Sequence, residues 1–364
     1  MDAQDPALAR LTEKINEARE RRMPLEIRGG GTKLFYGGIP AGAPLDLTAL
    51  CGITSYEPTE LVVTARAGTR LEELEAALQE CGQCLPFEPP RFAPGGTLGG
   101  MVAAGLSGPA RASVGSVRDH VLGVTMLNGL GELQSFGGQV AKNVAGYDVA
   151  RLMAGSLGIL GVICEVSIKV LPISAAGATL IFDWDEARSL AQLRRWAAQP
   201  LPINATAWQD GRLCVRLAGA RAAVAAACAR LGGEQMAADD AATWWPGVRD
   251  QTADYFSLNA GSLADGESLW RMSVPAAAPA LVLPGPQFIE WGGAQRWCRT
   301  DAQAAILRDA AARAGGHATL MKSADKSPGA FAPLSTVLMR VHQRLKQAFD
   351  PAGIFNPGRL YAGL

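Results

Sequence analysis

The sequence has no segment that could carry the chain into or across a membrane. The largely apolar stretch Leu152–Cys164, which carries no charged residue, is only thirteen residues long, whereas a helix that spans a bilayer needs about 20 residues. Residues Met1–Pro6 contain neither a basic nor an apolar segment, so we expect no signal peptide. These absences favour the cytoplasm as the location of the protein.

An excess of charge of either sign is also missing. The 364 residues include 34 basic and 34 acidic side chains, and without a basic stripe nucleic-acid binding has little support. The hydrophobic fraction of 48% and the charged fraction of 19% are those of an ordinary globular protein rather than a disordered one. At about 150 residues per domain, the length indicates two domains.

Cysteine and histidine, which commonly hold metal ions, are scarce. Seven cysteines without an export signal indicate free thiols. Only Cys81 and Cys84 form a CxxC pair, and because a zinc or iron–sulfur site needs about four ligands, we expect no metal. The pair ends a helical pattern, so a packing role is favoured over a redox one. The three histidines are His120, His317 and His342, and they form no His-x-His pattern.

Glycine, in contrast, is abundant, and its first cluster follows a short expected strand, Leu25–Ile27. The segment Gly29–Thr32 is not a Rossmann loop, because the residues after it are too Gly-rich to begin a helix. It is not a P-loop either, since no Gly-Lys-Ser/Thr follows at the required spacing. Taken alone, it is either a loop whose N–H groups bind an anion or an ordinary tight turn.

Two further glycine clusters favour the anion-binding loop over the ordinary turn. Pro94–Gly100 continues to Gly108 with mostly small residues, and Gly155–Gly161 leads directly into a strand that begins at Val162. Segments so poor in side chains pack weakly, but they suit a backbone that lies against a large flat ligand. Three such segments, each beside a strand, indicate a dinucleotide buried between two sub-domains.

Hydrophobic periodicity places the regular elements. It predicts helices at residues 7–22, 71–80, 186–198, 220–231, 302–314 and 335–348. Strands are expected at residues 25–27, 61–67, 121–127, 132–136, 162–171, 213–217, 268–274 and 287–291. Leu8, Leu11, Ile15 and Ala18 share one face of the first helix, and Thr69 and Glu72 have the spacing of a capping box. Residues 86–115 show little regular pattern.

The residue pattern changes after Pro172, where expected Ala-rich helices begin to alternate with expected strands. This pattern is typical of an α+β domain with helices against an antiparallel sheet. We therefore expect a first domain at residues 1–172, a smaller α+β cap domain at residues 173–333, and a C-terminal helix and tail at residues 334–364 that return to the first domain.

The glycine segments carry a family resemblance. Arg28–Thr32, Pro94–Gly100 and Gly155–Ile163 resemble the FAD-binding domain of the vanillyl-alcohol oxidase type, also called the PCMH type. The tail Phe349–Arg359 resembles the end of the 2-hydroxy-acid branch of that family, and Lys142–Asp148 fits as well. Including Glu290-Trp291-Gly292-Gly293, essentially the whole chain is similar to the FAD-binding subunits of bacterial glycolate oxidases.

The resemblance implies a PCMH-type domain of two α/β sub-domains and a non-covalently bound FAD, because the histidine to which some relatives attach the flavin has no counterpart. It implies that the first segment wraps the pyrophosphate, the second lies along the pyrophosphate and flavin, and the third contacts the ribose and adenine. The cofactor-binding residues carried over in this way are Arg28, Gly29, Gly30, Gly31, Thr32, Pro94, Gly95, Gly96, Thr97, Gly99, Gly100, Ala104, Gly105, Ser107, Ser156, Gly158, Gly161 and Ile163.

It also implies a function within a complex. A larger paralogous flavin subunit and an iron–sulfur subunit would be the partners, and glycolate would be oxidised to glyoxylate with electrons passed to the respiratory chain. Through the complex, the protein would lie at the inner face of the cytoplasmic membrane. Two alternatives stay open: an independent FAD-dependent dehydrogenase for a 2-hydroxy acid such as D-lactate, and a non-catalytic scaffold with a flavin fold.

The catalytic residues are not identified by the sequence. Active members of the branch have His-rich signatures in the second domain, and His317 lies near that position without the expected preceding glutamate. His317 and His120 are therefore only candidates for a catalytic base, and His342 is expected to be an ordinary helix residue. Candidates for a cation that binds a substrate carboxylate are Arg271, Arg296, Lys322 and Arg359.

Overall fold

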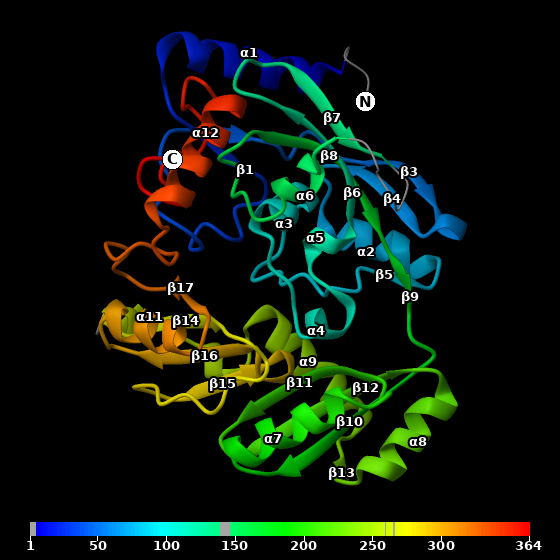
Figure 1. Ribbon diagram of the computed structural model, residues 1–364. Helices are drawn as coiled ribbons and strands as arrows, with labels where there is room; N and C mark the ends of the chain where they lie inside the picture. The colour runs from blue at the N-terminus through cyan, green and yellow to red at the C-terminus, as the bar shows by residue number, and fades with distance from the viewer. Residues whose placement is uncertain (1–4, 139–145, 259, 265) are drawn as a thin grey trace. The chain divides into compact units, whose positions relative to one another are not determined.

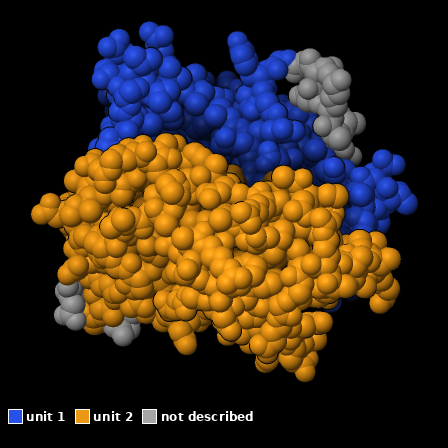
Figure 2. Space-filling view, turned by 60° about the horizontal axis from the view of Figure 1, so that its bottom comes forward, with its two compact units in different colours: residues 1–106, 116–172, 333–364 blue, residues 107–115, 173–332 orange. Residues whose placement is uncertain are grey.

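The computed structural model describes residues 5–138, 146–258, 260–264 and 266–364, which form two compact units (Figure 1 and Figure 2). Unit 1 comprises Met1–Leu106, Ser116–Pro172 and Pro333–Leu364, and unit 2 comprises Ser107–Gly115 and Ile173–Ala332. The chain thus passes into unit 2 after Pro172, at the position where the residue pattern of the sequence changes. The short excursion Ser107–Gly115 into unit 2 was not anticipated from the sequence.

Unit 1 is built around a five-stranded antiparallel sheet with strand order β3-β4-β8-β6-β7. Its strands are β3 (Ile53–Glu57), β4 (Val62–Arg66), β6 (Val121–Leu127), β7 (Leu133–Gly137) and β8 (Val162–Lys169). Parallel β1 (Leu25–Arg28) and β2 (Ala43–Asp46) form one small sheet, and β5 (Gln83–Cys84) and β9 (Leu171–Pro172) form another. The strands expected at residues 121–127 and 132–136 are confirmed as β6 and β7, which pair as an antiparallel hairpin.

The helices of unit 1 follow the apolar pattern where that pattern is strong. Helix α1 (Pro6–Arg21) buries Leu8, Leu11, Ile15 and Ala18, the four residues predicted from their spacing. The other helices are α2 (Leu71–Glu80), α3 (Leu98–Ala104), α5 (Val117–His120), α6 (Val149–Met153) and α12 (Thr336–Phe349), with a 3-10 turn η1 at Pro58–Glu60.

Two local expectations are wrong. Helix α2 begins after Arg70 and has no capping box, because the Thr69 hydroxyl instead accepts a hydrogen bond from the Gly52 N–H at 2.9 Å. Helix α3 lies in a stretch where no regular element was expected. It forms because the Thr97 hydroxyl caps it, accepting from the Gly100 N–H, and because its first turn packs against Ala67.

Unit 2 contains an eight-stranded antiparallel sheet with strand order β13-β10-β12-β11-β15-β16-β14-β17. Its strands are β10 (Ala176–Asp183), β11 (Ile203–Gln209), β12 (Arg212–Gly219), β13 (Glu234–Gln235), β14 (Ser268–Ser273), β15 (Gln287–Glu290), β16 (Gln295–Thr300) and β17 (His317–Lys322). The expected strands at 213–217, 268–274 and 287–291 are confirmed as β12, β14 and β15.

The helices of unit 2 are α4 (Arg111–Val114), α7 (Glu186–Ala197), α8 (Arg221–Leu231), α9 (Ala238–Asp250), α10 (Ala260–Ala264) and α11 (Ala304–Arg313), with 3-10 turns η2 (Asp254–Phe256) and η3 (Trp291–Gly293). The segment around α4 is held within unit 2 by Trp291, whose indole N–H donates to the Gly108 carbonyl at 3.0 Å and whose ring lies under the Arg111 guanidinium. All eight tryptophans of the chain belong to unit 2. In the described part of the chain, no helix is long and apolar enough to cross a membrane.

Candidate functional site

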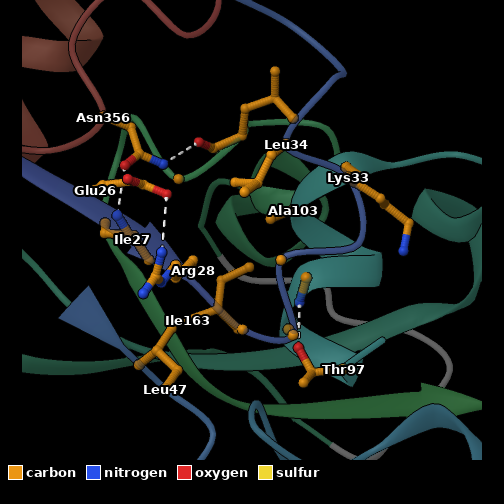
Figure 3. Close-up of a pocket in the computed structure, with 18 of the residues that line it drawn as sticks. Glu26, Ile27, Arg28, Lys33, Leu34, Leu47, Thr97, Ala103, Ile163 and Asn356 are labelled. Atoms are coloured by element: carbon orange, nitrogen blue, oxygen red, sulfur yellow. Dashed lines mark hydrogen bonds and ion pairs between the residues drawn. The ribbon is translucent and has the colours of Figure 1, made fainter. Parts of the chain in front are cut away.

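A cleft in unit 1 brings the glycine segments together (Figure 3). Residues from β1, from the loop after it, from α3, from the third glycine segment and from the C-terminal tail line its wall. They are Glu26, Ile27, Arg28, Gly29, Gly30, Gly31, Thr32, Lys33, Leu34, Pro40, Leu47, Thr97, Gly99, Gly100, Ala103, Ala104, Leu157, Gly158, Gly161, Ile163, Asn356 and Arg359. Segments more than 300 residues apart in the sequence therefore share one cavity.

Several glycines of the wall are required by the close approach of backbones. A Cβ on Gly29 would lie 2.1 Å from the Thr97 hydroxyl oxygen, and one on Gly30 would lie 1.7 Å from the Gly95 carbonyl oxygen. Such distances are far below van der Waals contact, so any side chain would push the first and second glycine segments apart. These two glycines allow the segments to form one continuous wall.

The third glycine segment is held in the same way by other parts of unit 1. A Cβ on Gly161 would meet the Met126 methyl group at 2.1 Å, and one on Gly158 would meet the Asn356 amide nitrogen at 2.7 Å. Gly158 also has φ +74°, a backbone region that side chains other than glycine rarely adopt. The segment can therefore pack against both β6 and the C-terminal tail.

The C-terminal tail closes one end of the cleft through Asn356 and Arg359. The Asn356 amide accepts from the Ile27 N–H at 2.6 Å and donates to the Leu157 carbonyl at 2.7 Å, which ties β1 to the third glycine segment. The buried Arg359 guanidinium donates to the carbonyl oxygens of Leu34, Gly38 and Tyr36. Burial lowers the pKa of Arg359, and the nearby Glu26 carboxylate opposes this effect.

The first loop offers uncommitted hydrogen-bond donors. Across the described residues, the backbone N–H groups of Gly29, Gly30, Gly31 and Thr32 donate to no protein acceptor. The Arg28 side chain is 38% exposed and lies 3.9 Å from the Glu26 carboxylate. Successive free N–H groups beside a guanidinium are the chemistry that binds phosphate oxygens.

Twelve of the eighteen residues predicted to bind the cofactor line this cleft, and six do not. Those that line it are Arg28, Gly29, Gly30, Gly31, Thr32, Thr97, Gly99, Gly100, Ala104, Gly158, Gly161 and Ile163. Pro94 and Gly95 line a neighbouring cleft, Gly105 packs against Gly155, and Ser156 is buried with its hydroxyl accepting from the Gly158 N–H. Gly96 lies near Leu71, and Ser107 belongs to unit 2.

Other wall residues were not singled out for cofactor binding. Glu26 and Asn356 carry no glycine signal, and their relation to the cleft depends on contacts that are not local in sequence. The motif Lys142–Asp148 had been noted, but its first four residues lie outside the described residues. Its last residue, Asp148, caps α6 by accepting from the Arg151 N–H.

The three histidines lie on three different elements, α5, β17 and α12. His120 is buried at the end of α5 with its ring 5.3 Å from that of Phe87. His317 is the exposed first residue of β17 in unit 2, and partial burial and the Arg271 charge lower its pKa. His342 lies on α12, where its Nδ1 is 2.8 Å from the Leu338 carbonyl oxygen. None of the three lines the cleft in unit 1.

The candidate carboxylate-binding cations are placed differently from one another. Arg296 is fully buried in unit 2, where it bonds the Gly293 carbonyl at 2.6 Å and the Glu186 carboxylate at 3.2 Å, so its role is structural. Arg359 is equally committed to backbone carbonyls in unit 1. Arg271 lies in β14 and Lys322 ends β17, and burial lowers the pKa of Lys322.

Cys84 of the CxxC pair does not have the electrostatics of a redox-active thiol. Cys81 is exposed, whereas Cys84 in β5 is partly buried. Burial, followed by the charges of Glu88 and Glu75, raises the pKa of Cys84. A redox-active thiol has a lowered pKa, so the packing role is favoured.

The cleft fits FAD by the chemistry of its wall. Free N–H groups and Arg28 can balance the charge of a pyrophosphate without a metal ion. Glycines and alanines of α3 present a flat surface with little side chain, and Leu47 and Ile163 supply apolar area for a planar ring. Such a wall can hold a dinucleotide along its length.

Comparisons with known proteins agree with this fit. A family model described as the FAD binding domain matches residues 8–137, and one described as the C-terminal domain of FAD linked oxidases matches residues 324–360. The glycolate oxidase subunit GlcE of Escherichia coli strain K12 is 46% identical over 354 residues, covering 97% of both chains.

More distant relatives share the cofactor domain or the fold. The glycolate oxidase subunit GlcD of Bacillus subtilis strain 168 is 30% identical over 175 residues, which cover 48% of this chain and 37% of that protein. A solved structure of alkyldihydroxyacetonephosphate synthase superposes with a TM-score of 0.64 and 16% identity, over 95% of this chain and 74% of that chain. The α+β architecture is therefore that of the PCMH-type flavoproteins, and the chain, which carries their FAD-binding domain, belongs to the family of the glycolate oxidase subunit GlcE.

Proposed function

We propose that this protein is the FAD-binding redox subunit of a multi-subunit glycolate oxidase. The observation that carries the proposal is the cleft of unit 1, in which uncommitted N–H groups and Arg28 meet a wall of glycines. Similarity to GlcE over 97% of the chain supports the assignment to glycolate oxidation. As an FAD-dependent oxidoreductase of 2-hydroxy acids, it would act only within the complex.

In this proposal, the first loop binds the pyrophosphate of FAD. The N–H groups of Gly29–Thr32 donate to its oxygens, and Arg28 adds a positive charge. The backbone of Thr97–Gly100 and Ala104 lies along the cofactor, and Gly158, Gly161 and Ile163 contact its adenosine side. When bound, FAD supplies the capacity to take two electrons from an alcohol carbon and to release them one at a time.

The scarcity of histidine determines the role that we assign within the complex. A 2-hydroxy-acid dehydrogenase needs a base that removes the hydroxyl proton, and no histidine lines the cleft. His317 and His120 stay candidates, but we propose that substrate oxidation occurs mainly on the partner flavin subunit. This chain would relay or store electrons, or shape the site of the partner.

The proposal names two partners. One is a larger paralogous flavin subunit, and the similarity of this chain to part of GlcD, which is longer, supports it. The other is an iron–sulfur subunit that passes electrons to the respiratory chain, which would place the complex at the inner face of the cytoplasmic membrane.

Purification of the chain alone and with its partners tests the proposal. We expect the chain alone to bind FAD non-covalently, so that acid precipitation leaves the flavin in the supernatant, and to keep its flavin oxidised when glycolate is added. With the larger subunit, glycolate should bleach both flavins.

A colourless chain that cannot be reconstituted with FAD would refute the cofactor assignment and favour a scaffold. Bleaching of the isolated chain by glycolate or D-lactate would refute the subunit role and favour an independent dehydrogenase.

A further inference from the structure

The wall of the FAD cleft contains a carboxylate without a hydrogen-bond donor. Glu26 lies on β1, its side chain is only 16% exposed, and its Oε1 atom is buried. The nearest cation is Arg28, whose Nη1 is 3.9 Å from Oε1, beyond the length of a hydrogen bond. Among the residues that the structure describes, none donates a hydrogen bond to this carboxylate.

The two other polar neighbours of Glu26, Asn356 and Arg359, cannot supply the missing donor, because they are committed elsewhere. The Asn356 amide group bridges the Leu157 carbonyl and the Ile27 N–H. The Arg359 guanidinium donates to three carbonyl oxygens and acts on Glu26 only through its charge. Figure 3 shows Glu26 with Asn356 and Arg28 on one side of the cleft. A buried carboxylate oxygen without a donor is unfavourable, so the donor is expected to come with the ligand.

The order of groups along β1 indicates which part of a ligand this is. Glu26 and Arg28 are two residues apart on a strand, so their side chains project from the same face, from backbone positions about 6.6 Å apart at 3.3 Å per residue. The free N–H groups of Gly29–Thr32 follow directly. Along the chain, the Glu26 carboxylate, which accepts hydrogen bonds, is therefore followed by Arg28 and N–H groups, which donate to an anion. A ligand in which a sugar with free hydroxyl groups adjoins a phosphate has the matching order of groups.

We infer that Glu26 accepts hydrogen bonds from the hydroxyl groups of the sugar that adjoins the pyrophosphate of the bound dinucleotide. This inference rests on the proposed binding of FAD. FAD has two such sugars, the ribose of its adenosine and the ribityl chain of its flavin, and both offer the same hydroxyl chemistry. A hydroxyl that carries a phosphate group cannot donate in this way and meets a negative charge, so Glu26 also selects against 2′-phosphorylated nucleotides.

Titration of the FAD-free chain with FAD, followed by quenching of flavin fluorescence, tests the inference. We expect Glu26→Leu to weaken FAD binding by about tenfold or more, the size of one charge-assisted hydrogen bond, and Glu26→Gln to weaken it less, because its amide oxygen still accepts. Glu80→Gln, at the exposed end of α2, is the matched control and should bind as the wild type does. Unfolding of each variant in urea without FAD shows whether it is folded.

Two fragments of the cofactor then identify the sugar. If Glu26 meets the ribose, Glu26→Leu weakens the binding of ADP and not that of FMN; if it meets the ribityl chain, FMN binding is the one weakened. The wild-type chain provides a test that needs no variant, since it should bind 2′-deoxy-ADP or 2′-deoxyribityl FMN more weakly than the parent fragment. Equal affinity of wild type and Glu26→Leu for FAD, or no loss with either deoxy fragment, would overturn the inference. Failure of the wild type to bind FAD at all would instead refute the proposed function.

Discussion

Single glycines in the cleft have a packing role beside the ligand-binding role that we propose for them. From sequence alone, the absence of side chains suggested only a backbone that lies against a ligand. The structure adds a second cause, because Cβ atoms on Gly29, Gly30 and Gly161 would collide with protein atoms. Gly31 differs from them, since its surroundings are open and its φ of +69° is the reason for glycine there. If the loop binds FAD as we propose, it would therefore lose the cofactor when its packing alone is disturbed.

Gly30→Ala tests this packing role. Its Cβ would overlap the Gly95 carbonyl oxygen, so we expect the first two glycine segments to separate. Overpacking of this kind costs about 1–3 kcal/mol of unfolding free energy, and FAD binding should be lost with it. The measurement is urea unfolding together with flavin titration.

Gly138→Ala is the matched control, because no heavy atom lies within 4 Å of its Cβ position. It should change stability by no more than about 0.5 kcal/mol. If Gly30→Ala behaves like Gly138→Ala in both measurements, the close approach of the two loops is not what requires glycine at position 30.

Among the helices and strands, those with a strong local signal could be predicted from the sequence. The apolar face of α1 and the hairpin of β6 and β7 are examples. Helix α3 could not be predicted, because its Gly-rich sequence opposes helix formation and only the Thr97 cap and the contact with Ala67 favour it. The contacts of Asn356 and Arg359 in the cleft could not be predicted either, because they join residues more than 300 positions apart. The place of Glu26 could not be predicted because no motif includes it.

The contact between α12 and the C-terminal tail supplies a prediction for this element. The buried Lys346 ammonium donates to the Ile159 and Phe355 carbonyl oxygens and to the Asp350 carboxylate, all within 2.8 Å. Burial lowers the pKa of Lys346, and the bond to Asp350 opposes this. Lys346→Met leaves the carboxylate buried without its cation, so we expect a loss of about 3–5 kcal/mol in unfolding free energy. Arg344→Met, on the exposed side of the same helix, should cost less than about 0.5 kcal/mol in the same urea experiment.

A pair between two segments of unit 2 predicts a dependence on pH. Glu267 accepts two hydrogen bonds from Arg299 on β16, at 2.9 and 3.0 Å, and these lower the pKa of Glu267 below its ordinary value of 4.5. A carboxyl group with a lowered pKa in the folded state stabilises the fold at neutral pH and loses that contribution as the pH falls below 4.5. Glu267→Gln should therefore lose at most about 1 kcal/mol at neutral pH and differ less from the wild type in acid.

Unfolding followed at several pH values measures this difference. Glu234→Gln, in exposed β13, is the control and should follow the wild type throughout. A gap between Glu267→Gln and wild type that stays constant into acid would contradict the role of the pair.

For the molecule as a whole, the division into two units predicts where FAD stabilises the chain. Each unit has its own apolar core, and the cleft lies in unit 1 alone. At an FAD concentration about 100-fold above its Kd, binding adds about 2.7 kcal/mol to the stability of the part that holds it. Amide hydrogens of β4, β6 and β8 that exchange through unfolding should slow by about 100-fold, and those of β12 and β14 should not. Equal slowing in both units would show that they unfold as one.

The distribution of tryptophan has a practical consequence for such work. All eight indole rings lie in unit 2, so ultraviolet emission from tryptophan originates there and nowhere else in the chain. The visible emission of a flavin in the cleft would originate in unit 1. One unlabelled sample thus carries two optical signals of separate origin and colour. The folding of one unit and the cofactor content of the other can be recorded together, without an engineered dye.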